Sequence, residues 1–167
     1  MGRLGIDDIE NLRSVRLGLA ERDELLAAQT ECTFCFRGPD GWPSGVIMSF
    51  LLAEGHFWFT SVAGRPQVDR LAEDARVSLV VTNAGTDLPG RQMLTLRGTA
   101  VVHRDAARKD WFFGEFTRRH QPADPAAFRR LLDSPNRVVI EVTPTGIAAS
   151  HDSRRMPGNG RGGVTGS

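Results

Sequence analysis

Two cysteines stand at a spacing that occurs in metal and redox sites. Cys32 and Cys35 form a C-x-x-C pattern, which can hold a metal ion or form a reversible disulfide. Thr33, Phe34 and Phe36 favour a β-strand, however, and positions i and i+3 of a strand point to opposite faces, so the two sulfurs would diverge. A redox pair usually opens a helix, and no second Cys/His pair stands at zinc-finger spacing. The pattern therefore favours buried core thiols over a functional pair.

The four histidines, His56, His103, His120 and His151, are isolated in the sequence. None has a carboxylate or a second histidine at metal-site or triad spacing, so structural or surface roles are expected. The chain contains no G-x-S-x-G elbow, phosphate-loop lysine motif or H-E-x-x-H motif, and it contains no tyrosine. If the chain transfers hydride, a cofactor ring must do the difficult step, while the protein supplies position and exclusion of water.

Composition narrows the class of protein. A chain of 167 residues, 40% of them hydrophobic and 25% charged, has the length and apolar content of one globular domain. The formal net charge of +1 leaves no basic surplus for nucleic acid. The longest apolar run, 46–53, is far shorter than the ~20 residues that cross a bilayer, and Asp7, Asp8 and Glu10 interrupt any signal-peptide pattern. We expect a cytoplasmic protein that binds neither nucleic acid nor membrane.

Periodicity indicates the elements that must position any site. A helical pattern covers about 5–28, with Gly18 between two pieces, and a period of two begins at Glu31. Six strands are expected, at 31–37, 42–52, 56–60, 76–82, 91–103 and 137–143. Helices are expected at 67–74, 105–120 and 124–132, the second capped by Asp105 and the third opened by Asp124 and Pro125. Residues 1–152 then form one domain, and 153–167 form a flexible tail rich in Gly, Arg and Ser.

This order of elements predicts a mainly β fold with flanking helices, a six-stranded antiparallel barrel that is closed or partly closed. The segment 42–52 is nearly continuous in apolar and small residues, which indicates a central strand buried on both faces. Gly98, in the middle of the fifth strand, is expected to form a bulge or bend. Such barrels hold cofactors at their mouths or at dimer grooves, so ligand binding is expected.

Four stretches, taken in order, carry a resemblance to a known family. They are DGWPSGV at 40–46, FWFTS at 57–61, LAEDARVSL at 71–79 and RQMLTLRGTA at 91–100. With these stretches, residues 25–152 resemble the pyridoxamine-phosphate-oxidase-like split-barrel flavoproteins, which include the deazaflavin-dependent reductases of actinobacteria. The resemblance implies an FMN-binding split barrel that forms a homodimer, with a site in each interface groove.

The resemblance also implies where the flavin ring lies. In the family, the strand after the D-G-x-P turn lays its backbone along the isoalloxazine ring, which here implies Val46, Ile47, Met48 and Ser49. Backbone N–H groups beside a barrel opening can donate to the carbonyl oxygens and nitrogens of the ring without a particular side chain. Gln92 matches the family position whose amide reaches the ring or the ribityl chain, and an amide both donates and accepts.

The phosphate end is implied at the start of the short helix, where hydroxyls and helix N–H groups can bind an anion. The residues implied there are Thr60, Ser61, Arg65, Gln67 and Arg70. The sequence departs from the family at Pro66 and Gln67, where relatives usually carry a basic pair or a single lysine. Arg65 is expected to supply the missing cation, with Arg70 one helical turn further along. The alternative is that both arginines are solvated surface residues.

The C-terminal part separates this chain from the enzymes that make vitamin B6. It lacks the segment bearing Arg and Trp that grips the substrate phosphate in true pyridoxamine-phosphate oxidases, and 137–152 resembles the ending of the deazaflavin and small flavin reductase branch. The resemblance therefore implies an oxidoreductase that binds FMN or a deazaflavin and acts on a small organic substrate. Two alternatives stay open: a protein that holds a flavin or, less favoured, haem for storage or sensing, and an interaction protein without a ligand.

Overall fold

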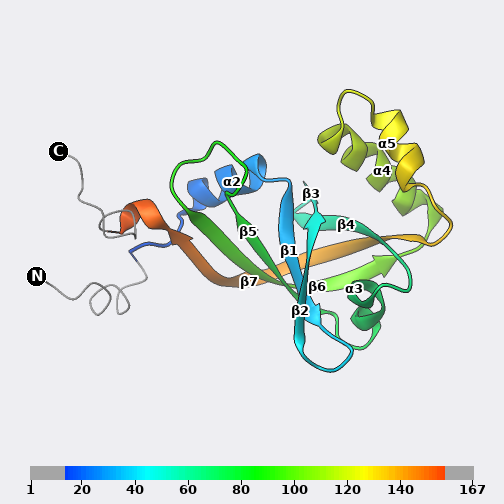
Figure 1. Cartoon of the computed structure of the whole chain (residues 1–167), viewed down its shortest axis with the longest axis horizontal. Helices are drawn as coiled ribbons and strands as arrows, with labels where there is room; N and C mark the ends of the chain where they lie inside the picture. The colour runs from blue at the N-terminus through cyan, green and yellow to red at the C-terminus, as the bar shows by residue number, and fades with distance from the viewer. Residues whose placement is uncertain (1–13, 157–167) are drawn as a thin grey trace, which may run out of the picture.

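The computed structural model describes residues 14–156, which form a curled antiparallel sheet flanked by helices (Figure 1). Its seven strands lie in the order β2-β1-β5-β6-β7-β4-β3. Their bounds are β1 Glu31–Arg37, β2 Pro43–Ser49, β3 Leu51–Ala53, β4 His56–Val62, β5 Arg76–Thr82, β6 Gln92–His103 and β7 Arg137–Asp152. The mainly β class with flanking helices is therefore confirmed.

The two edge strands of the sheet, β2 and β3, are separated in the chain by Phe50 alone. β2 pairs with β1, whereas β3 pairs with β4 at the opposite edge of the sheet. The backbone N–H of Phe50 donates to the carbonyl oxygen of Thr30 at 3.0 Å, where the chain changes partners. The sheet must therefore curl until its two edges approach each other, which produces a half-barrel.

This change of partner corrects two predictions. Six strands were expected and seven are present, because the segment predicted as one strand at 42–52 is divided at Phe50. Both pieces lie at sheet edges rather than in the centre, and β2 exposes Pro43, Gly45, Ile47 and Ser49. The run of apolar and small residues continues through the break, so periodicity alone could not show that its two halves pair with different strands.

β6 and β7 form the longest pairing, from Gln92 with Asp152 to His103 with Val139. The register shifts between Arg97 and Gly98, which confirms the predicted irregularity at this glycine. A Cβ atom on Gly98 would lie 2.5 Å from Cγ1 of Val142 and 2.9 Å from the carbonyl oxygen of Thr143, so the strands approach too closely for a side chain.

β7 is longer than the predicted strand at 137–143. The first six residues of β7 pair with β4 on one side, but from Thr143 onward the strand has only β6 as a neighbour. Pro144 lies in this edge portion, where a strand tolerates the loss of an N–H donor. The proline therefore does not end the strand.

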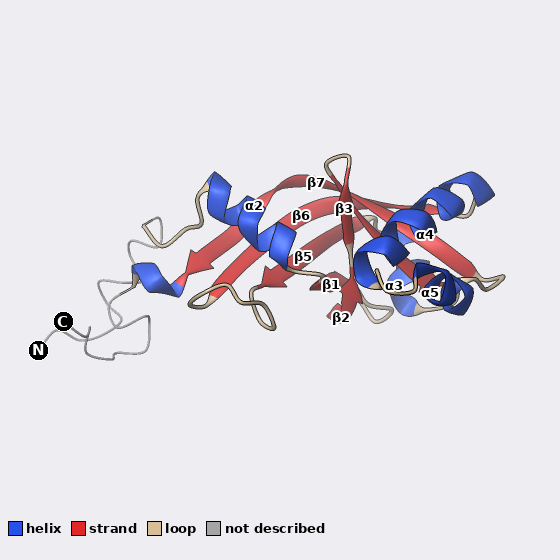
Figure 2. Ribbon diagram, turned by 90° about the horizontal axis from the view of Figure 1, so that it is seen from above, coloured by secondary structure: helices blue, strands red, loops and turns tan. Residues whose placement is uncertain are grey.

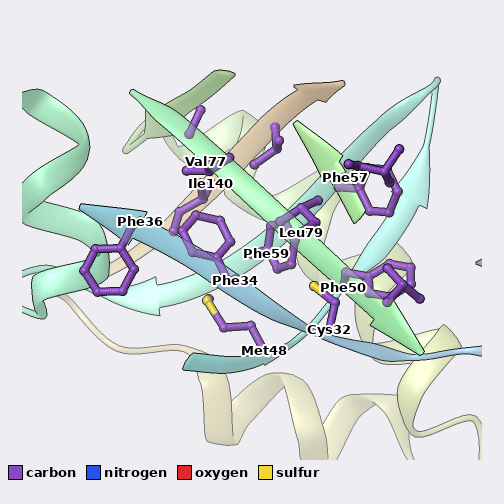
Figure 3. Packing of buried hydrophobic residues seen from close by; sticks show 14 of the residues in the cluster. Cys32, Phe34, Phe36, Met48, Phe50, Phe57, Phe59, Val77, Leu79 and Ile140 are labelled. Carbon is purple, nitrogen blue, oxygen red and sulfur yellow. The ribbon is translucent and has the colours of Figure 1, made fainter. Parts of the chain in front are cut away.

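The interior of the half-barrel holds the main hydrophobic core (Figure 3). Alternate residues of β1 and β4 point inward, and the rings of Phe34 and Phe59 meet edge to face at 5.2 Å between centroids. Leu25, on helix α2 (Leu19–Ala28), is fully buried in the same core. The alternation that predicted β1 thus reflects one face packed in the barrel.

A second hydrophobic cluster lies on the outer face of β4 and β7, under helices α4 (Ala106–His120) and α5 (Pro125–Leu132). Trp58 packs there against Trp111 at 4.8 Å between ring centroids. The predicted caps are confirmed, since the Asp105 and Asp124 carboxylates each accept a backbone N–H from the first turn of their helix. The α4–α5 pair and α2 lie at opposite ends of the sheet (Figure 1).

The remaining helices are short (Figure 2). α3 (Pro66–Asp69) continues into η1 (Arg70–Ala72), as the pattern at 67–74 predicts, and η2 (Ser153–Arg155) follows β7. Of the helical segment expected at 5–28, residues 19–28 are helical, 14–18 are not, and the rest lies outside the described residues. Ser153 is buried, and the part of the expected tail after residue 156 also lies outside them. Between residues 14 and 156, no helix is long and apolar enough to cross a membrane.

Candidate functional site

A pocket of about 340 Å³ lies where the sheet is split. β3 covers β4 only from His56 to Trp58, so the rest of β4 has no strand on that side, and β2 forms the opposite lip. We call this hollow the split pocket. Its lining consists of Val46, Ile47, Met48, Ser49, Thr60, Ser61, Arg65, Gln67, Phe116, Phe128, Leu132 and Arg137. Eight of the ten residues that the sequence implied for a cofactor site are in this set.

β2 offers its main chain to the split pocket. As an edge strand it pairs only with β1, so the backbone groups on its other side have no strand partner. Ile47 is 65% exposed, whereas Met48 is buried and points into the core. Free N–H and C=O groups beside an open pocket can bind the polar edge of a planar ligand. The free edge of β2 is therefore available to a ligand, and the role of 46–49 at a flavin stays a prediction.

Hydroxyl and amide groups form one polar end of the pocket. The Gln67 Nε2 donates to Oγ of Ser61 at 3.3 Å, and both side chains are buried. Because the Ser61 hydroxyl accepts this bond, its own proton is free to be donated to a ligand. Thr60 instead donates its hydroxyl to the carbonyl oxygen of Val138 at 2.9 Å.

Two arginines lie at the same end. Arg65 precedes α3, and Arg137 begins β7 and donates its Nε to the carbonyl oxygen of Leu132 at 2.9 Å. Burial, and then the nearby charge of Arg65, lower the pKa of the Arg137 guanidinium. Neither arginine forms an ion pair with any acidic group in the described part of the chain. Two like charges facing one pocket without an acid favour an anionic ligand.

The start of α3 contributes less than expected. Its amides at Val68 and Asp69 both donate to the carbonyl oxygen of Arg65, and the helix has only four residues. Side chains rather than a row of free helix N–H groups must therefore bind an anion here.

Four side chains that the sequence did not suggest for the site complete the pocket. Phe116 comes from α4, while Phe128 and Leu132 come from α5, and together they form an apolar wall. The helical pattern of α4 placed Phe116 on an apolar face, but which opening that face would cover depends on tertiary packing. Arg137 was likewise predicted only as a strand residue.

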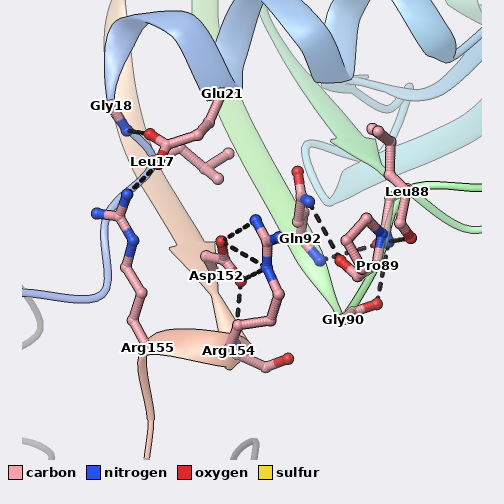
Figure 4. A network of polar contacts seen from close by, with 12 residues as sticks. Leu17, Gly18, Glu21, Leu88, Pro89, Gly90, Gln92, Asp152, Arg154 and Arg155 are labelled. Atoms are coloured by element: carbon pink, nitrogen blue, oxygen red, sulfur yellow. Dashed lines mark hydrogen bonds and ion pairs between the residues drawn. The ribbon is translucent and has the colours of Figure 1, made fainter.

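Two residues that the resemblance implied for the cofactor site do not line the split pocket. Arg70 forms an ion pair with Glu73 at 2.7 Å and does not line the split pocket. Gln92 is 1% exposed and donates its Nε2 to the carbonyl oxygen of Pro89 at 3.2 Å (Figure 4). It pairs with Asp152, at the far end of β7 from Arg137, and it does not line the split pocket. The structure of one chain therefore does not place Gln92 at this pocket.

The histidines are less isolated than the sequence suggests. Oε1 of Glu141 lies 2.9 Å from Nδ1 of His56, and Oε2 of Glu141 lies 2.7 Å from Nε2 of His103. These contacts join β4, β6 and β7, because the three strands are neighbours in the sheet. No sequence spacing brings the three residues together, so only strand pairing reveals the cluster. Within residues 14–156, no group of side chains has the arrangement of a metal site.

The cysteines behave as the strand pattern predicts. Cys32 is buried in the core, Cys35 is half-buried on the other face of β1, and both are free thiols. Burial, followed by the nearby Cys35 and Glu31, raises the pKa of Cys32 to about 12. A thiol with so high a pKa is a poor nucleophile and metal ligand at neutral pH.

Fold and site together define a split β-barrel protein with a pocket between its separated edges. A family model described as pyridoxamine 5'-phosphate oxidase matches residues 19–151, and the chain belongs to this family. The resemblance noted in the sequence is thereby confirmed. A search of curated proteins finds no match.

Several solved structures share the fold. A conserved hypothetical protein from Mycobacterium tuberculosis superposes with a TM-score of 0.73 at 19% identity, over 92% of this chain and 96% of that chain. An F420 reductase gives a TM-score of 0.58 at 22% identity, over 75% and 94%. The haem storage protein HutZ from Vibrio cholerae gives 0.64 at 12% identity, over 79% and 94%. At these identities the likeness concerns the fold alone.

Proposed function

We propose that this chain binds FMN or a deazaflavin in the split pocket and acts as an oxidoreductase on a small organic substrate. The observation that carries the proposal is the pair Arg65 and Arg137 at the polar end of the pocket. A phosphate dianion would balance the two guanidinium charges, and the Ser61 hydroxyl adds a neutral donor beside them. Gln67 then holds Ser61 in place, where relatives carry a basic residue.

The rest of the split pocket suits a planar ring. Its volume of about 340 Å³ falls within the range of ordinary ligand pockets. The free edge of β2 provides main-chain donors and acceptors at 46–49, while Phe116, Phe128 and Leu132 provide an apolar wall. A bound flavin would supply the ring that takes up or releases hydride. The chain's own residues would bind its phosphate, orient the ring and exclude water from one side.

The proteins of similar structure bind or use more than one kind of cofactor, according to their names. One is an F420 reductase, which points to a deazaflavin, and HutZ is a haem storage protein. Haem needs an axial ligand, commonly His or Cys, and the lining of the split pocket includes neither. Met48 lines the pocket, but it belongs to the buried core. We therefore favour a flavin-type cofactor and keep a non-catalytic binding protein as the second candidate.

A homodimer is part of the proposal. Gln92 does not line the split pocket of its own chain, and we propose that it fulfils its implied role at the flavin in the site of a second copy. Size-exclusion chromatography with light scattering would show whether the chain forms a dimer in solution. A monomer at all concentrations would remove Gln92 from the cofactor site.

Calorimetric titration of the apo-protein with FMN, riboflavin and F420 tests the proposal. FMN should bind more than about tenfold tighter than riboflavin, because only FMN carries the phosphate. Arg65→Gln combined with Arg137→Gln should abolish this difference, whereas the matched variant Arg70→Gln should retain it. If none of the three ligands binds, or if FMN and riboflavin bind equally and F420 binds no tighter than either, the proposal is wrong. Bleaching of the loaded protein by dithionite, followed by reoxidation with candidate substrates, separates an enzyme from a storage protein.

A further inference from the structure

A second, larger hollow of about 600 Å³ lies across the outer face of β1, β5 and β6. Cys35 pairs with Ser78, and Ser78 pairs with Arg97, so these residues form a row across three strands. The hollow shares no lining residue with the split pocket, and no helix contributes to its lining. We call it the arginine pocket, because Arg37, Arg76 and Arg97 line it.

The bulge at Gly98 helps to shape the arginine pocket. The register between β6 and β7 shifts between Arg97 and Gly98, and both residues line the hollow, as does Thr99. A bulge bends its strand and redirects neighbouring side chains, and bulges are over-represented beside functional sites. Most of the lining therefore comes from the sheet, while Gly41 and Asp74 come from adjoining loops.

The charges in this pocket are unbalanced. Asp74 is the acidic residue of the lining, and Arg76 occupies both of its oxygens, with Nε on Oδ1 at 2.8 Å and Nη2 on Oδ2 at 2.6 Å. These hydrogen bonds hold the pKa of the Asp74 carboxyl well below its usual range, so it stays ionised and paired. Arg37 and Arg97 form no ion pair with any described residue. Two guanidinium groups thus remain for a ligand.

The remaining lining is suited to an apolar body. The exposed Pro43 contributes apolar surface, the largely buried Phe36 and Val77 are also in the lining, and Ser78, Thr99 and Thr145 contribute hydroxyl groups. We propose that the arginine pocket binds a small organic anion with a flat apolar body and one carboxylate or phosphate group. The planar guanidinium forks of Arg37 and Arg97 match either anionic group, while the hydroxyls fix its orientation. This site is independent of the flavin proposal, since the two pockets share no residue.

Calorimetric titration with benzoate, phenyl phosphate and the neutral benzamide tests the arginine pocket and distinguishes the two anions. The titrations use the Arg65→Gln/Arg137→Gln variant, so that the split pocket does not bind the probe. At least one anion should bind with a stoichiometry of one per chain, and at least about tenfold tighter than benzamide. Adding Arg37→Gln and Arg97→Gln should weaken that anion about tenfold or more, while Arg37→Lys and Arg97→Lys should retain part of the affinity.

Three results would overturn the arginine-pocket proposal. They are the absence of binding by both anions, equal binding of benzamide, and an affinity unchanged by Arg37→Gln/Arg97→Gln. A face covered by a second copy of the chain would give the first of these results. Thermal melts check that the variants fold, which is expected because both arginines are exposed. FMN titration of Arg37→Gln/Arg97→Gln should match the wild type, so failure here and failure of the flavin proposal are distinguishable.

Discussion

Arg65, which precedes α3, and Arg137, the first residue of β7, line the same pocket, whose lining includes no acidic residue. Burial and the nearby charge of Arg65 lower the pKa of the Arg137 guanidinium. The two like charges therefore destabilise the folded protein when no anion is bound. Sites that hold like charges together commonly trade stability for binding. The effect of the two arginines on the free energy of unfolding and their effect on ligand affinity can be measured separately.

Arg65→Gln should separate the two effects. Because Arg65 is exposed and repels Arg137, its removal should leave the free energy of unfolding within about 0.5 kcal/mol of the wild type, or raise it slightly. FMN affinity should fall about tenfold, and its dependence on salt should weaken, because one charge–phosphate contact is lost. Urea denaturation and titrations at two salt concentrations measure both. A large loss of stability would show that Arg65 has a structural role instead.

Gln67→Lys would restore the basic residue usual in relatives. Gln67 is 8% exposed and shares the pocket with Arg65 and Arg137, so the lysine would add a third positive charge without an acid. We expect the apo-protein to lose roughly 1–3 kcal/mol of stability and to recover part of it when FMN is bound. Thermal melts with and without FMN test this. A variant as stable as the wild type in the absence of FMN would contradict the expectation.

Gly98→Ala should destabilise the sheet at the bulge. A Cβ atom there would meet Val142 at 2.5 Å and the Thr143 carbonyl oxygen at 2.9 Å, so two strands must separate. The expected loss is about 1–3 kcal/mol in urea denaturation. Gly146→Ala on β7 is the matched control, because nothing lies within 4 Å of its added Cβ, and it should be nearly neutral. Equal effects of the two substitutions would refute the packing argument.

The contact between Glu141 and His103 should contribute to stability. Their side chains are 20% and 21% exposed and meet at 2.7 Å between neighbouring strands. His103→Ala and Glu141→Ala should each destabilise the protein by about 1–2 kcal/mol, and a double-mutant cycle should give a coupling energy of roughly 0.5–1.5 kcal/mol. Additive effects of the two substitutions would mean that the contact itself contributes nothing.

We expect the free energy of unfolding to fall at high pH, because the folded state raises the pKa of the Cys32 thiol. Its folded pKa, about 12, lies above the ordinary value of 9.0, so the folded state holds the proton that the unfolded state releases. The stabilising contribution is complete below pH 9 and is lost as the pH rises towards 12. Tyrosine is absent, which removes one competing titration in this range. Denaturation midpoints at pH 8, 9.5 and 11 measure the loss, and Cys32→Ala should flatten the pH dependence. The folded protein should also resist alkylation at pH 8.

The sequence alone determined the elements whose rules are local. Alternation in β1 and β5, the carboxylate caps of α4 and α5, and the glycine at the β6 bulge each depend on neighbouring residues or on the backbone of one position. Val46 to Ser49 and four residues between Thr60 and Gln67, which the family motifs implied for a cofactor site, line one pocket, and their role in binding stays a prediction.

Only the tertiary structure decided which distant segments meet. It divides the predicted second strand at Phe50, brings Arg137 beside Arg65, and places Gln92 at the other end of β7. It also joins His56 and His103 through Glu141. Local sterics and caps fix the conformation of a few residues at a time, whereas strand pairing is chosen by burial over the whole sheet, so residues far apart in sequence acquire their partners only when the barrel closes.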